Sequence, residues 1–214
     1  MTHGPRLALV SSASGHRIGV FGGTFDPPHL GHIATALEVR HTLRLDRVLL
    51  VVANDPWQKT RSAPVTPAPV RLALTRAAVA SVDGIEACDI EIVRGGPTYT
   101  ADTLRELGVG SPSSRYWLLV GSDAAAGLDT WERPDDVRKL ATTVVVDRKG
   151  REGGRPPPGW AHEVVDVPAL EISSSAIRSR VRNDEPIRGL VPAAVADMID
   201  ELELYQDGQD QDPT

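Results

Sequence analysis

The sequence predicts a doubly wound α/β protein with a mostly parallel sheet and two helices at its C-terminal end. Two observations lead to this class. Short, almost continuous apolar runs alternate with segments of helical spacing along most of the chain. The apolar runs are typical of parallel strands that are buried on both faces. Because strands and helices alternate, right-handed crossovers should build a parallel sheet that helices cover.

The first half of the chain opens with a predicted strand at 17–23, an apolar run that ends in two glycines. A helix follows from about His29, where apolar residues recur at helical spacing. The continuous apolar run 46–54 predicts a second, buried strand. Thr66, followed by a proline, predicts the cap of a helix that runs through 70–80.

The second half continues the alternation. Residues 85–93 alternate apolar and polar side chains, as a half-exposed strand does. A helix at 98–107 follows a Gly-Gly-Pro turn, and 115–121 is another buried strand. The Pro-rich segment 54–69 is long enough for a functional loop. The remaining predicted elements are a helix at 134–141, strands at 142–147 and 162–168, and helices at 173–183 and 192–205.

Length and composition indicate one folded domain. The chain has 214 residues, 41% hydrophobic and 24% charged, which excludes a mainly disordered or collagen-like protein. We expect a flexible N-terminal extension at 1–16, a single domain at 17–205 and a disordered acidic tail at 206–214. Seven of the 29 acidic residues lie from Asp197 onward, where Lys and Arg are absent. The nearly neutral remainder suits a small polyanionic ligand and argues against a nucleic-acid partner.

The cysteine count and the hydropathy pattern bear on location. Cys88 is the single cysteine, so an intramolecular disulfide or a Cys-rich zinc site is excluded. No apolar run reaches the roughly 18 to 20 residues of a membrane span, and no secretory signal is recognisable. We therefore expect a cytoplasmic protein with no membrane partner.

Chemistry is expected where the first strand ends, because doubly wound sheets bind ligands beyond the carboxyl ends of their strands. Gly22 and Gly23 let a ligand approach the backbone there. His29 and His32 lie on one face of the first turn of the next helix, whose free amides favour an anion. The glycines could equally form a plain tight turn beside surface histidines. The histidines could also be a zinc pair, with Asp26, Cys88 or a distant histidine as third ligand.

The segment GGTFDPPHLGH, residues 22–32, resembles the signature of the HxGH-type nucleotidyltransferases. The resemblance extends over roughly residues 17–205. Within this family, the chain most resembles the bacterial nicotinate mononucleotide adenylyltransferases. The resemblance implies a Rossmann-like nucleotidyltransferase fold and the joining of ATP to nicotinate mononucleotide, which yields nicotinate adenine dinucleotide and pyrophosphate. Further segments that carry it are PWQK (56–59), PTYTADTL (97–104), LLVGSD (118–123), LDTW (128–131), ISSSAIRSRV (172–181) and the closing LVPAAVADMIDELELY.

The resemblance implies an ATP site in which two histidines and an arginine act on the phosphates. Adenylyl transfer requires neutralisation of a triphosphate and in-line placement of the acceptor, with no nucleophilic side chain. Mg²⁺ is expected to arrive with ATP, with no dedicated protein ligand. Arg178 could instead be a solvated helix residue, and Asp123 could cap a helix. The implied catalytic residues are His29, His32 and Arg178, and the implied ATP-binding residues are Gly22, Gly23, Thr24, Phe25, Gly121, Asp123, Ile172, Ser173 and Ser174.

The resemblance also implies a pocket for the acceptor. Backbone amides near Thr100 would hold the nicotinate carboxylate, and Trp131 would stack on the pyridine ring. Trp131 could alternatively pack in the core, whereas Trp117 is expected there. Two departures weaken the match, since the lysine of PWQK is displaced from the usual spacing and Ser175 replaces a frequent threonine. The implied acceptor-binding residues are Lys59, Thr98, Tyr99, Thr100 and Trp131.

Three other functions remain open from the sequence. The chain could be another HxGH adenylyl- or cytidylyltransferase, such as a phosphopantetheine adenylyltransferase. It could be a sensor that binds a nucleotide without turning it over, or a zinc hydrolase. The segments PTYTADTL and LDTW argue against the first of these, and His29, His32 and Arg178 argue against the second.

Overall fold

The fold is built on one sheet of six strands in the order β3-β2-β1-β4-β5-β6, and every neighbouring pair is parallel. The computed structural model describes residues 15–56, 65–148 and 153–206. The predicted doubly wound sheet is therefore confirmed, and its strands are all parallel. The strands are β1 (Arg17–Gly23), β2 (Arg47–Val52), β3 (Ile85–Cys88), β4 (Arg115–Gly121), β5 (Ala141–Arg148) and β6 (His162–Val167).

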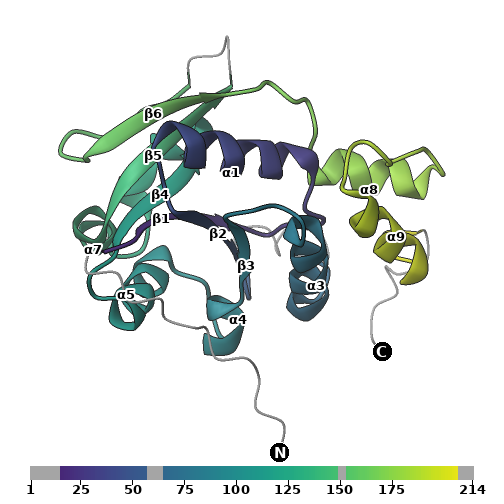
Figure 1. The fold of residues 1–214 in the computed structure, drawn as a ribbon, viewed down its shortest axis with the longest axis horizontal. Helices are drawn as coiled ribbons and strands as arrows, with labels where there is room; N and C mark the ends of the chain where they lie inside the picture. Colours follow the sequence, from purple (N-terminus) through teal and green to yellow (C-terminus); the bar gives the residue numbers. More distant parts are fainter. Residues whose placement is uncertain (1–14, 57–64, 149–152, 207–214) are drawn as a thin grey trace, which may run out of the picture.

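Helices cover both faces of this sheet (Figure 1). One face carries α1 (Leu30–Thr42), α3 (Ala68–Val79), α8 (Ser174–Arg182) and α9 (Ala193–Glu201). The other carries α5 (Thr100–Gly110), α6 (Ser122–Ala125), the short 3₁₀ helix η1 (Leu128–Thr130) and α7 (Pro134–Leu140). The small helix α4 (Ile90–Arg94) follows β3. The result is the three-layer arrangement that alternating strands and helices predict.

Two hydrophobic clusters hold the layers together, one on each face of the sheet. In β4 the side chains alternate, so that Trp117 belongs to the cluster under α1, α3, α8 and α9 while Leu118 belongs to the cluster over α5 and α7. Trp117 is 3% exposed, which confirms its predicted place in the core. This alternation is the reason that the strands read as continuous apolar runs, because both faces are buried.

The winding of the sheet reverses at β1. The chain moves outward from β1 to β2 and β3 on one side, then returns to place β4, β5 and β6 on the other. Gly22 and Gly23 end β1, and Gly121 ends β4. Since β1 and β4 are parallel neighbours, these glycines lie at the same edge of the sheet. That edge is the switch point at which such folds bind ligands.

The structure corrects three predicted elements. The strand predicted at 85–93 ends at Cys88, and α4 follows it, with Glu91 turned inward and 5% exposed. Pro67, and not Thr66, is the N-cap of α3, because the Pro67 carbonyl accepts the first bonds of the helix, from the amides of Val70 and Arg71. The last helix stops at Glu201, and positive φ angles at residues 203 and 205 turn the chain out of it.

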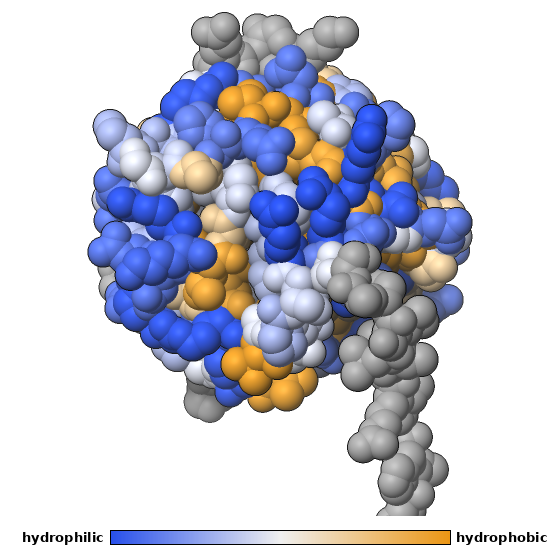
Figure 2. Space-filling model, turned by 60° about the vertical axis from the view of Figure 1, so that its left-hand side comes forward, coloured by the Kyte–Doolittle hydropathy of each residue, from blue (hydrophilic) through white to orange (hydrophobic). Residues whose placement is uncertain are grey.

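The surface is mixed in character. In the view of Figure 2, hydrophilic side chains separate several hydrophobic patches. Within the described ranges, no helix is long and apolar enough to cross a membrane.

Candidate active site

Two cavities meet at the glycine-lined edge of the sheet. The first has a volume of about 670 Å³ and the second about 570 Å³. Both are lined by residues 21–24 of β1 and its exit, and by Gly121 of β4. A Cβ atom added at Gly22 or at Gly121 would meet no atom within 4 Å. The space above these two glycines is therefore open, which leaves room for a ligand to approach the backbone there.

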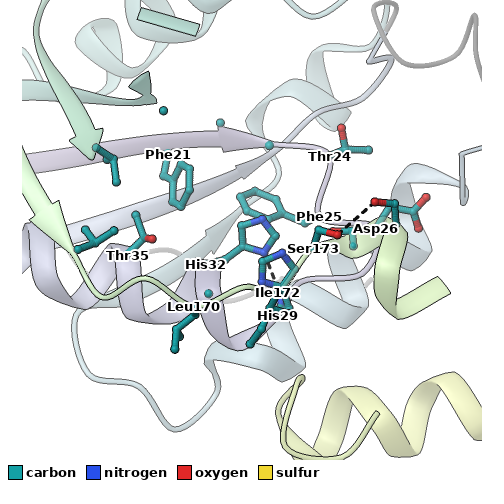
Figure 3. A pocket seen from close by; sticks show the side chains of 18 of the residues that line it. Phe21, Thr24, Phe25, Asp26, His29, His32, Thr35, Leu170, Ile172 and Ser173 are labelled. Carbon is teal, nitrogen blue, oxygen red and sulfur yellow. Dashed lines mark hydrogen bonds between the residues drawn. The ribbon is translucent and has the colours of Figure 1, made fainter. Parts of the chain in front are cut away.

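The start of α1, with His29 and His32, lines the first cavity (Figure 3). The imidazoles of His29 and His32 are stacked, with ring centroids 3.7 Å apart and planes inclined by 26°. The backbone N–H of His29 donates to Nδ1 of His32 over 3.2 Å. In the neutral ring the proton of His32 therefore resides on Nε2, which makes that nitrogen a donor. The edge of Phe25 packs against His32, with ring centroids 5.0 Å apart.

Two glycines make room for these rings. A Cβ atom on Gly31 would lie 3.0 Å from Nδ1 of His29. On Gly23 it would lie 2.7 Å from the ring of Phe25, which itself has φ +51°. The glycine of the HxGH element and the second glycine of β1 are therefore needed for the side chains beside them as well as for ligand approach.

Asp26 lies at the centre of a hydrogen-bond network that fixes the exit loop of β1. Its side chain is buried, and Oδ2 accepts from the amide of Thr66 over 3.2 Å. Oδ1 accepts from the phenol of Tyr205 over 2.7 Å. The carbonyl of Asp26 accepts from Nη1 of Arg178 over 2.7 Å. The exit loop is thereby tied to the start of α3, to α8 and to the end of the described chain.

Arg71 on α3 is the second fixed point of the same region. Its side chain is 1% exposed and donates to the carbonyls of Thr24, Ala53, Asn54 and Thr66 over 2.7 to 3.2 Å. Burial lowers the pKa of Arg71, and the negative charge of Asp26 opposes this shift. Thr24 and Ala53 follow β1 and β2, and both line the second cavity. The buried guanidinium of Arg71 therefore holds the backbone of both segments in place by hydrogen bonds.

The start of α8 forms another wall of the first cavity. Oγ of Ser173 caps the helix by accepting from the amide of Ala176 over 3.2 Å. The hydroxyl of Ser174 donates to the carbonyl of Pro27 over 2.8 Å. The hydroxyl proton of Ser174 is therefore already used in a hydrogen bond. An anion bound here would be held mainly by the first-turn amides of α8. Arg178, four residues on, lines the same cavity.

The second cavity collects the residues predicted for the acceptor. Thr98, Tyr99 and Thr100 line it at the N-terminus of α5, and Trp131 lines it after η1. Trp131 also packs partly against the core cluster over α5 and α7, so its side chain contacts both the core and the second cavity.

Glu91 is a buried carboxyl in the wall of this second cavity. Its Oε1 accepts from the hydroxyl of Thr103 over 2.6 Å. Burial raises the pKa of Glu91, while the hydrogen bond from Thr103 and the charge of Arg94 oppose the shift. The second cavity thus contains a carboxyl group that burial favours in its neutral form.

The remaining predicted residues fall as follows. Asp123 is exposed, lines the first cavity and makes no capping bond to α6, so the capping alternative is wrong for this residue. Ile172 lines the first cavity beside Ser173. Lys59 lies outside the described residues.

The zinc alternative finds no ligand set in the described part of the chain, where no three His, Cys, Asp or Glu side chains gather closely enough to hold a metal ion. The carboxylate of Asp26 already accepts from Thr66 and Tyr205. Cys88 ends β3 and is half-buried.

Sequence reasoning missed three residues of this region: Arg71, Glu91 and Tyr205. For Arg71 a signal was present, because it shares a helical stripe with Leu74 and Ala78, both buried. A cation in such a stripe must find acceptors inside the protein. Glu91 was missed because the strand prediction for its segment was wrong. Tyr205 was missed because its hydrogen bond to Asp26 spans 179 positions, and no local pattern indicates such a contact.

The parallel sheet and the paired cavities at its switch point define an α/β protein built to bind ligands at that edge, and the sequence comparisons give its class, the nucleotidyltransferases. The sequence model of the family described as "Cytidylyltransferase-like" matches residues 20–180. The chain belongs to this family and, within it, to the nicotinate-nucleotide adenylyltransferases, as the following similarities show.

The chain is similar to the "Probable nicotinate-nucleotide adenylyltransferase" of Corynebacterium kroppenstedtii, with 41% identity over 92% of this chain and 94% of that protein. It is 39% identical to the protein of the same name from Shouchella clausii, over 91% and 99% of the two chains. Among solved structures, the nicotinic acid mononucleotide adenylyltransferase of Plasmodium falciparum complexed with NaAD has a TM-score of 0.73 and 18% identity, over 89% of this chain and 97% of that one. This last similarity concerns the fold alone.

Proposed function

We propose that this chain transfers the adenylyl group of ATP to nicotinate mononucleotide, forming nicotinate adenine dinucleotide and pyrophosphate in the biosynthesis of NAD. Relatives of about the same length with 39% to 41% identity bear the name nicotinate-nucleotide adenylyltransferase. The structural observation that carries the proposal is the meeting of two cavities above Gly22 and Gly121. Two nucleotides that react with each other need two sites with one shared opening.

The reaction needs positioning and charge stabilisation. A phosphate oxygen of nicotinate mononucleotide attacks the α-phosphorus of ATP, and a new P–O bond forms. The bond between the α-phosphorus and the bridging oxygen breaks, and its electron pair leaves with pyrophosphate. No side chain forms a covalent bond, so the protein contributes donors for the phosphate oxygens and a fixed geometry.

The first cavity is assigned to ATP. His29 and His32 would donate to phosphate oxygens as negative charge grows on the departing pyrophosphate. Nε2 of His32 suits this role because its Nδ1 already accepts from the backbone. Arg178 would meet the β and γ phosphates together with the first-turn amides at Ser174. The rest of the wall, where the adenosine would lie, includes residues 22–25, Gly121, Asp123, Ile172 and Ser173.

Mg²⁺ belongs to this proposal as part of the MgATP substrate. The cation usually keeps waters and phosphate oxygens as ligands, so no side chain of this chain is assigned to it. Asp123 is assigned to a ribose hydroxyl because its exposed carboxylate faces the cavity and caps no helix.

The second cavity is assigned to nicotinate mononucleotide. The first-turn amides of α5, at Thr100, would receive the nicotinate carboxylate, with Thr98 and Tyr99 beside them. Trp131 would stack on the pyridine ring from the opposite wall. Lys59 stays a predicted ligand of the acceptor phosphate. The cytoplasmic location and the absence of nucleic-acid and membrane partners also stay part of the proposal.

Product analysis tests the function directly. The purified chain is incubated with MgATP and, in separate reactions, nicotinate mononucleotide, nicotinamide mononucleotide or phosphopantetheine, and pyrophosphate and dinucleotide are measured. We expect nicotinate adenine dinucleotide as the main product. Turnover of phosphopantetheine alone would assign the chain to another branch of the family, and nucleotide binding with no pyrophosphate release would indicate a sensor.

A further inference from the structure

An ion pair joins the two walls of the second cavity. Asp102 lies in the first turn of α5, two residues after the segment 98–100 that forms one wall. Arg133 lies two residues after Trp131, which forms the opposite wall. Nη2 of Arg133 donates to Oδ2 of Asp102, across 31 positions of the sequence. The contact therefore fixes the distance between the two segments that would enclose a pyridine ring.

The backbone at Arg133 is unusual in a way that the ion pair explains. Arg133 is the N-cap of α7 and has φ 52° and ψ 58°, the left-handed region that a residue with a Cβ atom adopts at an energetic cost. A strained residue persists only where its surroundings hold it. The side-chain bond from Arg133 to Asp102 supplies such a contact at the point where the chain turns from Trp131 into α7.

The charges around the pair favour its ionised form. Asp102 faces the positive charges of Arg133, Arg94 and Arg105. The hydrogen bond from Arg133 is the largest cause that lowers the pKa of Asp102. Arg133 in turn faces the negative charges of Asp102, Glu132 and Asp136. The side chains of Asp102 and Arg133 are 31% and 36% exposed, so either can be replaced without leaving a charge in the core.

The contact belongs to the second cavity alone. Apart from residues 21–24 and Gly121, which line both cavities, the first cavity is lined mainly by the start of α1, the start of α8, the segment after β6 and residues 122–123. In Figure 1, α5 and α7 lie together on the side of the sheet opposite to α1. Loss of the pair should therefore loosen the acceptor wall and leave the ATP wall unchanged.

We propose that Asp102 and Arg133 are positioning residues that hold Trp131 at a fixed distance from the segment 98–100, and so determine affinity for the pyridine mononucleotide. This inference rests on the proposed function, because it assigns the second cavity to the acceptor. Neither residue lines the cavity, so both act through the groups beside them.

Steady-state kinetics on three variants test the pair: Asp102→Ala, Arg133→Ala and the double variant. Each single variant should raise the KM for nicotinate mononucleotide at least about fivefold, since small misplacements of positioning groups are costly. The KM for ATP should stay within about twofold. The double variant should match the singles, because either substitution removes the whole contact. Arg133→Lys, which keeps the charge, should recover part of the loss.

Arg105→Ala is the matched control. Arg105 also donates to Asp102, over 3.2 Å, but its other partner is Asp136 of α7 and not the segment that carries Trp131. It should leave the KM for nicotinate mononucleotide unchanged. Circular dichroism melting of every variant verifies that the fold persists at the assay temperature.

The outcomes separate this inference from the proposed function. A wild-type chain that makes no nicotinate adenine dinucleotide contradicts the proposed function. An active wild type whose Asp102→Ala and Arg133→Ala variants keep the acceptor KM contradicts the positioning role. Three further results would also contradict the positioning role. They are equal rises in the KM for both substrates, additive losses in the double variant, and an Arg105→Ala variant that behaves like Arg133→Ala.

Discussion

The phenol of Tyr205 donates a 2.7 Å hydrogen bond to Oδ1 of Asp26, 179 residues earlier in the chain. Asp26 belongs to the exit loop of β1, which lines the first cavity. Burial and the negative charge of Asp26 both raise the pKa of Tyr205, so the phenol stays protonated and keeps its role as donor. The end of the described chain thereby holds the loop that precedes both histidines.

Tyr205→Phe removes this donor and keeps the ring. We expect the unfolding free energy to fall by about 1 to 3 kcal/mol, because a buried carboxylate oxygen loses its partner. We also expect a higher KM for ATP, since Asp26 also accepts from Arg178 through its carbonyl. Thermal melting and ATP kinetics measure the two effects.

Tyr116→Phe is the control for Tyr205→Phe. The Tyr116 hydroxyl donates to the carbonyl of Leu107 over 2.7 Å, and Tyr116 lines neither cavity. The Tyr116→Phe variant should have a lower melting temperature and an unchanged KM for ATP. Equal ATP kinetics in the two variants would mean that the Tyr205 contact is structural only.

His32→Ala should lower kcat by about 10²-fold or more, because a donor to transition-state charge is typically worth about 3 kcal/mol. The matched control is His41→Ala, which removes an exposed histidine from the last turn of the same helix. A folded His32→Ala variant with wild-type kcat would remove His32 from the catalytic group.

Trp131→Ala should weaken binding of nicotinate mononucleotide by about 1 to 3 kcal/mol, or roughly 5- to 150-fold, with little change for ATP. Trp131→Phe keeps an aromatic face and should recover most of the affinity. Because stacking acts equally on nicotinate and nicotinamide rings, the preference between the two mononucleotides should survive. Calorimetric titration of both mononucleotides measures this. A loss of thermal stability with unchanged affinity would mean that Trp131 serves the core alone.

Glu91→Gln should change how stability depends on pH. Burial raises the pKa of Glu91, so folding favours the protonated carboxyl. Its contribution to stability is complete below the unfolded-state pKa, about 4.3, and is lost as pH rises through the raised folded-state value. The variant should therefore gain stability relative to wild type as pH rises.

Urea denaturation of both proteins between about pH 4 and about pH 8 measures the difference. Glu106→Gln is the control, because Glu106 pairs with the same Arg94 from an exposed position. A constant difference between wild type and Glu91→Gln across this range would show that Glu91 titrates alike in the folded and unfolded chains.

The sequence by itself determined the class of fold and predicted the edge of the sheet at which both cavities lie. Continuous apolar runs separated by helical spacing required a sheet buried on both faces, and such a sheet binds ligands where its strands end. Gly22, Gly23 and the two histidines are neighbours in the chain, so a local pattern sufficed to predict where they meet.

Only the tertiary structure decided what holds that site. Arg71, Tyr205 and the pair of Asp102 with Arg133 act through contacts between residues distant in the chain, and no local period encodes the partner of a side chain. The strand predicted at 85–93 was wrong for the same reason. Its alternating pattern permits a strand, but the contact of Glu91 with Thr103 favours a helical turn after Cys88. The spacing of apolar residues indicates which face of an element is buried, whereas the tertiary structure determines which residues that face contacts.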